Sequence, residues 1–333
     1  MKLLTIAIPT YNRSACLAEC LEQIVKQLPG HEDDIEIIVS DNCSTDDTPD
    51  VVARYIGRSS VIRSIRNSNN IGADNNFIQC FELSESVFFM LMGDDDVLLD
   101  GGMDYLLGIL KQEQCSSIFL RASAFIKDFR KEIVSSDPNR TYTIYNDPQE
   151  FIKKININAT FISSNIINKL DFPADVDLRR FYGTNLVQLG WIIPSIINAK
   201  RCIYVDRAVL AGRVFNSGNF RFFQVFAVNF NKVIEYFSHN GMASSTCDYL
   251  IHHLLTEFYP QRIYTIRTKQ ETYDDEGESI FDILQATYRN SLLFWIFVVP
   301  AIFLPVSFVK IFYKCEKKVY KRYNKIAKLF KWS

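Results

Sequence analysis

Residues 87–100 read VFFMLMGDDDVLLD, an apolar run followed, after one glycine, by three consecutive aspartates. A short apolar run of this kind is typical of a buried strand, so Asp94, Asp95 and Asp96 are expected at a strand end. Adjacent carboxylates repel one another and raise one another's pKa unless a cation joins them. Oxygen ligands of this type suit Mg²⁺ or Mn²⁺, whereas an ordinary solvated acidic turn explains the triplet equally well.

The sequence around this stretch alternates between short apolar runs and helical patterns. Strands are predicted at residues 3–10, 35–40, 61–65 and 87–92, and helices at residues 14–28, 51–56, 73–83 and 102–112. Such alternation predicts an α/β fold, with a mainly parallel sheet and helices on both faces. Beyond residue 116 the pattern is less regular, with strands expected at 117–122, 159–167 and 203–209 and helices at 183–199 and 220–237.

Polar residues follow the first strands, at the sheet edge where α/β proteins bind ligands. Tyr11 can stack on a base, Arg13 can reach a phosphate, and Asp41 can accept hydrogen bonds from a base or ribose. Gly72 permits close backbone approach, and Asn75 follows it at the start of the next predicted helix. Each of these segments, taken alone, is also explained as an ordinary turn between a strand and a helix.

Composition and charge argue against a disordered protein and against a nucleic-acid-binding protein. Hydrophobic residues make up 48% of the 333 residues and charged residues 23%, which argues against disorder. Residues 310–333 carry nine Lys or Arg and one acid, so this tail is near +8 and the rest of the chain near −9. An acidic body argues against nucleic-acid binding, and a basic tail suits an anionic surface. Without a CxxC pair or a long N-terminal apolar core, we expect a reduced cytoplasmic protein with no signal peptide.

Four segments together resemble glycosyltransferase family 2, which has the Rossmann-like GT-A fold. They are TIAIPTYNR at residues 5–13, IEIIVSDNCSTDDT at 35–48, NNIGADNNF at 69–77 and LMGDDDVLLD at 91–100. The chain is similar in particular to bacterial O-antigen and capsule sugar transferases of the abequosyltransferase type. No GxGxxG fingerprint supports a nucleotide-dependent oxidoreductase instead.

The resemblance implies a nucleotide-sugar site at the strand ends. It implies a donor pocket formed by Pro9, Thr10, Tyr11, Arg13, Asp41, Asn42, Gly72, Asn75 and Asp94. It further implies Mn²⁺ or Mg²⁺ bound through Asp94, Asp95 and Asp96, with Asp95 as the main ligand and a catalytic residue. The metal would offset charge on the departing diphosphate.

The catalytic base is less clear, because the sequence departs from the family at this point. The resemblance implies inverting transfer, in which a carboxylate removes the proton of the acceptor hydroxyl. Many relatives carry a Glu-Asp pair at the start of a later helix, but residues 181–191, FYGTNLVQLGW, contain no acid. Asp177, with Asp175 behind it, is the candidate base. An ordinary loop after Pro173 explains both residues as well.

The C-terminal end has the features of a membrane-associating segment. Residues 292–309, LLFWIFVVPAIFLPVSFV, carry no charge. As one helix they would reach ~27 Å, short of a ~30 Å hydrocarbon core, and Pro300 and Pro305 argue against a straight span. A kinked, re-entrant, interfacial or buried core segment is expected. The basic amphipathic pattern of 310–333 suits anionic lipid headgroups and a cytoplasmic position, on the inner membrane of a bacterium.

The expected organisation has four parts. Residues 1–115 are the nucleotide-sugar-binding half of a GT-A domain, 116–215 its acceptor-binding half, 216–290 a helical extension, and 291–333 the membrane-associating end. The predicted function is transfer of a sugar from a nucleotide-diphosphate or CDP sugar to a glycan hydroxyl, with a lipid-linked oligosaccharide of surface polysaccharide synthesis as the expected acceptor. A catalytically silent, membrane-bound nucleotide-sugar scaffold is the alternative.

Overall fold

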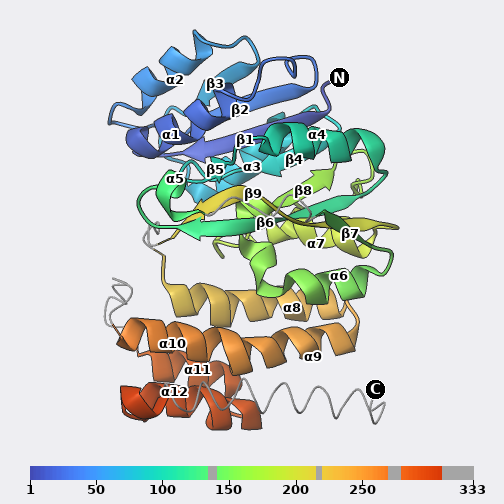
Figure 1. The fold of residues 1–333 in the computed structure, drawn as a ribbon. Helices are drawn as coiled ribbons and strands as arrows, with labels where there is room; N and C mark the ends of the chain where they lie inside the picture. The colour runs from blue at the N-terminus through green and yellow to red at the C-terminus, as the bar shows by residue number, and fades with distance from the viewer. Residues whose placement is uncertain (134–140, 215–219, 269–278, 310–333) are drawn as a thin grey trace. The chain divides into compact units, whose positions relative to one another are not determined.

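The computed structural model describes residues 1–133, 141–214, 220–268 and 279–309. The chain divides into two compact units, Met1–Phe220 with Glu235–Thr246, and Arg221–Ile234 with Cys247–Ser333. The first unit is an α/β domain built on one sheet, and the described part of the second is helical (Figure 1). Both predicted halves of residues 1–215 therefore fall in the first unit.

Four parallel strands form the N-terminal part of the sheet, as the sequence predicts. They are β1 (Leu4–Thr10), β2 (Ile35–Asp41), β3 (Ile62–Arg66) and β4 (Phe88–Leu91), in the order β3-β2-β1-β4. The sheet continues through β8 (Asn165–Asn168), β6 (Ser117–Phe125), β9 (Cys202–Arg213) and β5 (Val97–Leu98), and β7 (Tyr142–Tyr145) also pairs with β9. Because β8 runs antiparallel to β4 and β6, the sheet is mixed.

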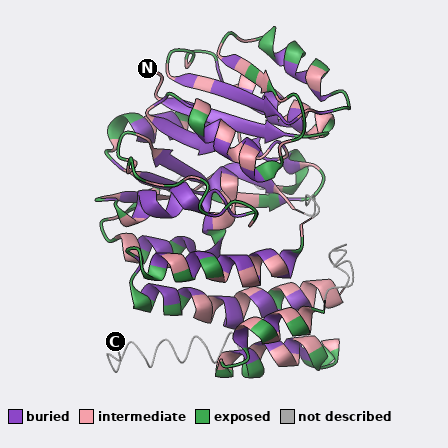
Figure 2. Cartoon of the chain, turned by 180° about the vertical axis from the view of Figure 1, so that it is seen from behind, coloured by how far each residue is buried: buried purple, intermediate pink, exposed green. Residues whose placement is uncertain are grey.

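Helices cover both faces of this sheet, which confirms the predicted α/β class. Leu4 and Ile8 of β1 share one core with side chains of α1 (Ser14–Val25), α2 (Thr48–Ile56) and α4 (Gly102–Gln112). On the other face, Phe81 of α3 (Ala73–Leu83) packs 5.2 Å from the ring of Phe89 and 5.3 Å from Trp191 of α7 (Leu189–Ile197). Figure 2 shows the central strands almost entirely buried, which is why they read as continuous apolar runs.

Two predicted elements are wrong in extent. Residues 159–167, predicted as one strand, begin with 3₁₀ turns at Asn156–Thr160 and Ile162–Ser164 and become β8 only afterwards. Residues 183–199, predicted as one helix, begin with a turn in which Gly183 has φ 79° and Asn185 has φ 58°. A residue with positive φ interrupts a right-handed helix, so α7 starts later. Apolar content alone cannot reveal either interruption. The short helices α5 (Phe129–Glu132) and α6 (Pro148–Ile155) complete the first unit.

The second unit consists of helices rich in aromatic side chains. The helix predicted at residues 220–237 is present as a π-helical segment, η3 (Gln224–Asn229), that continues into α8 (Phe230–Ser238). The division between the units falls within α8, so its end, from Glu235, belongs to the first unit. The helix is followed by α9 (Ser244–His253), η4 (Leu254–Phe258), α10 (Tyr259–Arg267) and α11 (Ile280–Tyr288). The ring of Phe222 packs 4.6 Å from Phe226 and 5.7 Å from Phe258. The polar ends of these large side chains are also paired, since the Tyr259 and Tyr288 hydroxyls lie 2.9 Å apart.

The apolar segment 292–309 is not one continuous helix. η5 (Phe294–Val298) runs into α12 (Val299–Phe303), and Leu304 then takes an extended conformation with φ −70° and ψ 150°. Pro305 explains this break, because the residue before a proline is disfavoured in helical geometry. Over the described ranges, we find no helix with both the length and the apolar character needed to cross a membrane. The predicted basic tail, residues 310–333, lies outside the described residues.

Candidate functional site

The ends of β1, β2 and β4 meet at one edge of the sheet. Thr10, at the end of β1, is in register with Asp41 at the end of β2, and the backbone N–H of Asn42 donates to the Thr10 carbonyl at 2.9 Å. The Thr10 hydroxyl donates to Asp94 Oδ2 at 2.7 Å. The structure therefore brings together the polar segments that the sequence places after these three strands.

Arg13 bridges two carboxylates of the aspartate triplet. Its Nη1 atom lies 3.1 Å from Asp94 Oδ1 and 2.9 Å from Asp95 Oδ2. The Asp94 side chain is 6% exposed and that of Asp95 15% exposed. Burial raises the pKa of Asp94 to about 6, against the opposing positive charge of Arg13. The more accessible Asp95 and the bridging guanidinium are thus the charged groups best placed to meet a ligand.

Asp96 points to different partners. Its Oδ2 atom accepts a hydrogen bond from the Ser163 hydroxyl, and its Oδ1 atom accepts one from the backbone N–H of Arg213 at 3.2 Å. Ser163 Oγ in turn accepts the backbone N–H of Gly93 at 2.8 Å. Burial, followed by the charge of Asp95, raises the pKa of Asp96 to about 7. Asp96 therefore fastens the triplet to the segment before β8 and to the end of β9.

The geometry bears on the predicted metal site. In the described part of the chain, no group of three or more His, Cys, Asp or Glu side chains is arranged to hold a metal ion, so the three carboxylates are not gathered as one ligand set. Asp94 and Asp95, however, converge on a single cationic nitrogen. Mg²⁺ and similar ions commonly use one or two protein carboxylates and complete their shell with phosphate and water. The pair Asp94 and Asp95 fits such an ion. Asp96 is hydrogen-bonded to Ser163 and to the backbone of Arg213 instead, and its predicted part in the metal site stays a prediction.

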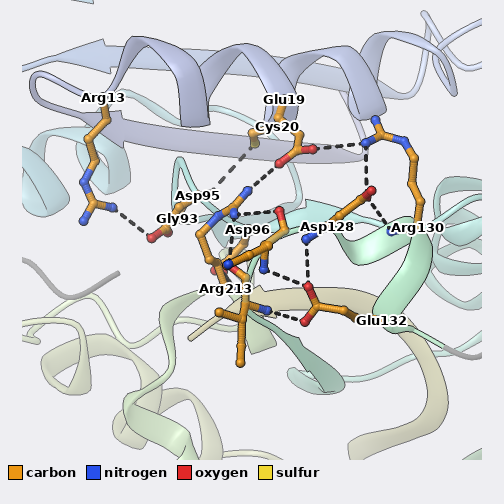
Figure 3. Close-up of polar contacts among 12 residues, drawn as sticks. Arg13, Glu19, Cys20, Gly93, Asp95, Asp96, Asp128, Arg130, Glu132 and Arg213 are labelled. Atoms are coloured by element: carbon orange, nitrogen blue, oxygen red, sulfur yellow. Dashed lines mark hydrogen bonds and ion pairs between the residues drawn. The ribbon is translucent and has the colours of Figure 1, made fainter. Parts of the chain in front are cut away.

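An ion-pair network that the sequence did not reveal supports this site. The Arg213 guanidinium pairs with Glu19 of α1, and Arg130 Nη1 lies 3.2 Å from the same carboxylate. Arg213 also donates to the carbonyls of Ile126 and Lys127 at 3.3 Å. Figure 3 shows Glu19 between the two arginines and Arg213 beside Asp96. The network anchors the end of β9 where its backbone holds Asp96.

Asp41 and Asn42 lie at the end of β2, beside Thr10 of β1. Asp41 is buried, and its Oδ1 atom accepts the backbone N–H of Ser44 at 2.8 Å. Asp41 Oδ2 lies 3.3 Å from Arg66 Nε but makes no hydrogen bond within the described residues. Asn42 stabilises a neighbouring loop instead, since its Oδ1 atom accepts the backbone N–H of Ile71 at 2.9 Å. Asp41 Oδ2 is thus a buried acceptor oxygen that is paired with the charge of Arg66 but forms no hydrogen bond within the described residues.

The other residues predicted to bind the nucleotide-sugar lie near the ends of β1 and β2 and at the start of α3. Pro9 lies within β1, opposite Ser40 of β2, while the Tyr11 side chain is 42% exposed beyond the strand. Gly72 precedes α3 with φ 82°, a conformation that favours glycine. Asn75 Nδ2 donates to the Ile71 carbonyl at 2.9 Å, so part of its side chain is used within its own turn.

Comparison with known proteins agrees with this arrangement. Residues 5–169 match the family described as glycosyl transferase family 2, and this range contains all four strand-end segments. The chain contains a glycosyl transferase family 2 domain. The family prediction made from the strand-end residues is therefore confirmed.

Relatives of the family 2 domain cover different lengths of the chain. Abequosyltransferase RfbV of Salmonella typhimurium is 28% identical over 229 residues, which are 63% of this chain and 66% of that protein. A GalNAc(5)-diNAcBac-PP-undecaprenol beta-1,3-glucosyltransferase of Campylobacter jejuni is 32% identical over 108 residues, 32% of this chain and 34% of that protein. The chain therefore matches less than two thirds of the length of these relatives. The structure of S. aureus TarS 1-349 in complex with UDP-GlcNAc has a TM-score of 0.60 at 15% identity, covering 97% of this chain and 92% of that one, which supports the same fold.

Asp177, the predicted base, lies beyond the family 2 domain. Its Oδ1 atom accepts the backbone N–H of Arg179 at 3.0 Å, and its Oδ2 atom lies 3.6 Å from Arg180 Nη2. The cavity that it lines, together with Asp175, contains none of the strand-end residues. The structure does not bring Asp177 together with Asp95, and its role as the base stays a prediction.

A buried acid in the family 2 domain holds the segment around Gly183. Asp74, in the first turn of α3, accepts the backbone N–H of Gly183 at 2.7 Å. Burial raises the pKa of Asp74, and hydrogen bonds from the backbone of residues 183–185 oppose that rise. Asn75 reaches the same segment, with its Nδ2 atom 3.2 Å from the hydroxyl of Tyr182. The adjacent Asp and Asn in NNIGADNNF were the available signal, but nothing in the sequence identified their partner.

Proposed function

We propose that the chain is a glycosyltransferase that moves a sugar from a nucleotide-diphosphate or CDP sugar to a glycan hydroxyl, with the assistance of Mn²⁺ or Mg²⁺. The observation that carries the proposal is the position of Arg13 Nη1, 3.1 Å from Asp94 and 2.9 Å from Asp95. Two neighbouring carboxylates can hold a divalent metal ion, and a guanidinium beside them can pair with a diphosphate. The family 2 domain supports the same function.

Each residue of the site has a separate part in this proposal. Asp94 and Asp95 hold the metal, which when bound supplies positive charge opposite the leaving diphosphate. Arg13, released from the carboxylates, pairs with the diphosphate oxygens. Asp41 accepts a hydrogen bond from the base or ribose. Exposed Tyr11 offers an aromatic face to the base. The proposal keeps inverting transfer, with Asp177 as the predicted base.

The direct test combines donor binding with transfer. We expect Asp95→Ala to abolish transfer and metal-dependent donor binding, measured by calorimetry with a panel of UDP, GDP and CDP sugars and Mn²⁺. Asp100→Ala is the matched control, because Asp100 lies close in sequence but is 70% exposed and pairs only with Lys26 among its charge partners in the described residues. Unchanged metal-dependent activity in Asp95→Ala would refute the assignment. Donor binding without turnover on any acceptor would instead favour the scaffold function.

We also propose that the second unit docks on the cytoplasmic face of a membrane and that the acceptor is lipid-linked. Large apolar side chains are exposed within the segment 292–309, namely Leu292, Trp295, Ile296, Phe303, Leu304 and Phe308. Exposed apolar residues clustered in one segment, next to the basic sequence of 310–333, suit the interface of an anionic bilayer. The undecaprenol acceptor named for the Campylobacter jejuni relative supports a lipid-linked substrate.

A further inference from the structure

The first unit contains a cavity of about 370 Å³, formed by three stretches of chain. One is the loop at residues 173–181, another is α7 with its C-terminal residue Asn198, and the third is the end of α8 with Asn240. All of these residues belong to the first unit, and none belongs to the strand-end site described above. A cavity of this size with apolar walls and a few polar groups is typical of small-ligand sites.

The walls of this cavity are fixed by contacts outside it. Gln149 of α6 donates to the Gly241 carbonyl at 3.0 Å and accepts the backbone N–H of Ala243 at 2.9 Å. A Cβ atom at Gly241 would lie only 2.7 Å from Ile197 Cγ2, so the chain packs directly on α7 there. The end of α8 is thus held against α6 and α7, and the cavity does not depend on how the two units are arranged.

One wall is aromatic. The rings of Phe181 and Tyr236 meet edge to face with centroids 5.6 Å apart, and Phe237 lies 5.7 Å from Phe181. The Arg180 guanidinium lies 5.3 Å from the Tyr236 ring centroid. Phe181 and Phe237 are buried and Tyr236 is half-buried, so Tyr236 is the ring that a ligand can cover.

The other wall is polar but carries little positive charge. Asp175 and Asp177 outnumber Arg180, which is already 3.6 Å from Asp177. An anionic ligand such as a nucleotide or a phosphate would therefore be repelled. Asn198 and Asn240 each donate one N–H to a backbone carbonyl, at 2.9 and 2.7 Å, and an amide has further donor and acceptor positions. Carboxylates and amides facing an aromatic ring suit a ligand with many hydroxyl groups and an apolar C–H face.

We propose that this cavity is a binding site for a neutral sugar unit of a glycan chain, separate from the nucleotide-sugar site. Tyr236 covers the C–H face of the sugar, while Asp175, Asn198 and Asn240 bond its hydroxyl groups. Its use as a distal subsite for the acceptor rests on the proposed transferase function, whereas sugar binding itself does not. The sugar site and the transferase function can therefore be refuted separately.

The test is ligand-observed NMR on the full chain. The probes are the methyl glycosides of glucose, galactose, mannose and N-acetylglucosamine with their disaccharides, and UDP and inorganic phosphate as anionic probes. We expect saturable binding of at least one neutral sugar, no competition by UDP, and unchanged binding in Asp95→Ala. Tyr236→Ala should weaken the affinity by about tenfold or more, and Tyr236→Phe, which keeps the ring, should retain it.

Several outcomes would overturn the proposal. They are binding of no neutral sugar, displacement of the sugar by UDP, binding of phosphate in place of sugar, or undiminished binding in Tyr236→Ala. If Tyr236→Ala does not fold, Asn240→Ala gives the same test, because Asn240 is exposed and its loss removes an amide without opening the core. If the full chain binds a neutral sugar but transfers no sugar to any acceptor, the proposed transferase function is contradicted and the sugar site is not.

Discussion

Arg13 Nη1 lies 2.9 Å from Asp95 Oδ2, although the two residues are 82 positions apart in the chain. The same nitrogen lies 3.1 Å from Asp94 Oδ1. The guanidinium therefore pairs with both carboxylates at the place where the proposed metal would bind. A metal ion held by the same carboxylate oxygens would displace Arg13, and the guanidinium would then be available to the donor diphosphate.

This exchange predicts opposite effects of one substitution on two ligands. Arg13→Gln should raise the affinity for Mn²⁺ alone, because the ion no longer competes with a charged hydrogen-bond donor worth about 1.5–3 kcal/mol. It should lower the affinity for a nucleotide-sugar by about tenfold or more, because the diphosphate loses its cationic partner. Calorimetry with Mn²⁺ alone, and then with donor at saturating Mn²⁺, measures both. A loss of affinity for both ligands would mean that Arg13 only supports the fold.

Asp96 should matter for stability, in contrast to Asp95. Asp96→Ala leaves the Ser163 hydroxyl and the Arg213 N–H without their acceptor, at a cost of about 1–3 kcal/mol. For a unit of this size the melting temperature should fall by roughly 2–12 °C, as differential scanning calorimetry can measure. Asp96→Asn keeps an acceptor oxygen and should recover most of the loss. Equal stability of Asp96→Ala and Asp95→Ala would contradict the structural role of Asp96.

Asp74 predicts a dependence of stability on pH. Burial raises its pKa above the ordinary value of 3.8, so the folded protein keeps a proton that the unfolded chain has already released. The stabilising contribution is complete below pH 3.8 and is lost as the pH rises through the pKa of the folded state. Asp74→Asn cannot titrate and should make the free energy of unfolding fall less steeply with pH above this value. Urea unfolding over a pH series measures the slope.

The control for this slope is Asp33→Asn, because Asp33 is exposed. That variant should keep the pH dependence of the parent protein. An Asp74→Asn variant with the parent slope would show that Asp74 does not carry the effect.

The sequence predicted the residues of the strand-end site better than the residues that hold them in place. Thr10, Arg13, Asp41 and the aspartate triplet each follow an apolar run, and parallel strands bring such ends to one edge. Ser163 and Arg213, which hold Asp96, come from segments without a clear periodicity, and their contacts cross 67 and 117 residues. Contacts of this kind depend on antiparallel and mixed pairing late in the sheet, which no local pattern specifies. The position of Asp177 could not be predicted either, since a loop after a proline carries no periodicity that places it, and its role as the base stays a prediction.

The exposed apolar side chains of the second unit predict reversible membrane docking. Phe303 and Phe308 are 62% and 61% exposed on either side of the break at Pro305. Burying a phenylalanine side chain in an apolar phase is worth about 1.5–3 kcal/mol. The double variant Phe303→Asp with Phe308→Asp should therefore bind anionic phospholipid vesicles at least about tenfold more weakly, as flotation of the full chain with such vesicles can measure.

The matched control for docking is Leu170→Asp, which changes a side chain that is 66% exposed in the first unit. It should float with the vesicles like the parent protein. Deletion of residues 292–333 should abolish flotation, because it removes both the exposed apolar side chains and the basic tail. If the double variant and the deletion both float as the parent does, residues 292–333 are not the docking surface, and the proposed membrane docking through this segment is refuted.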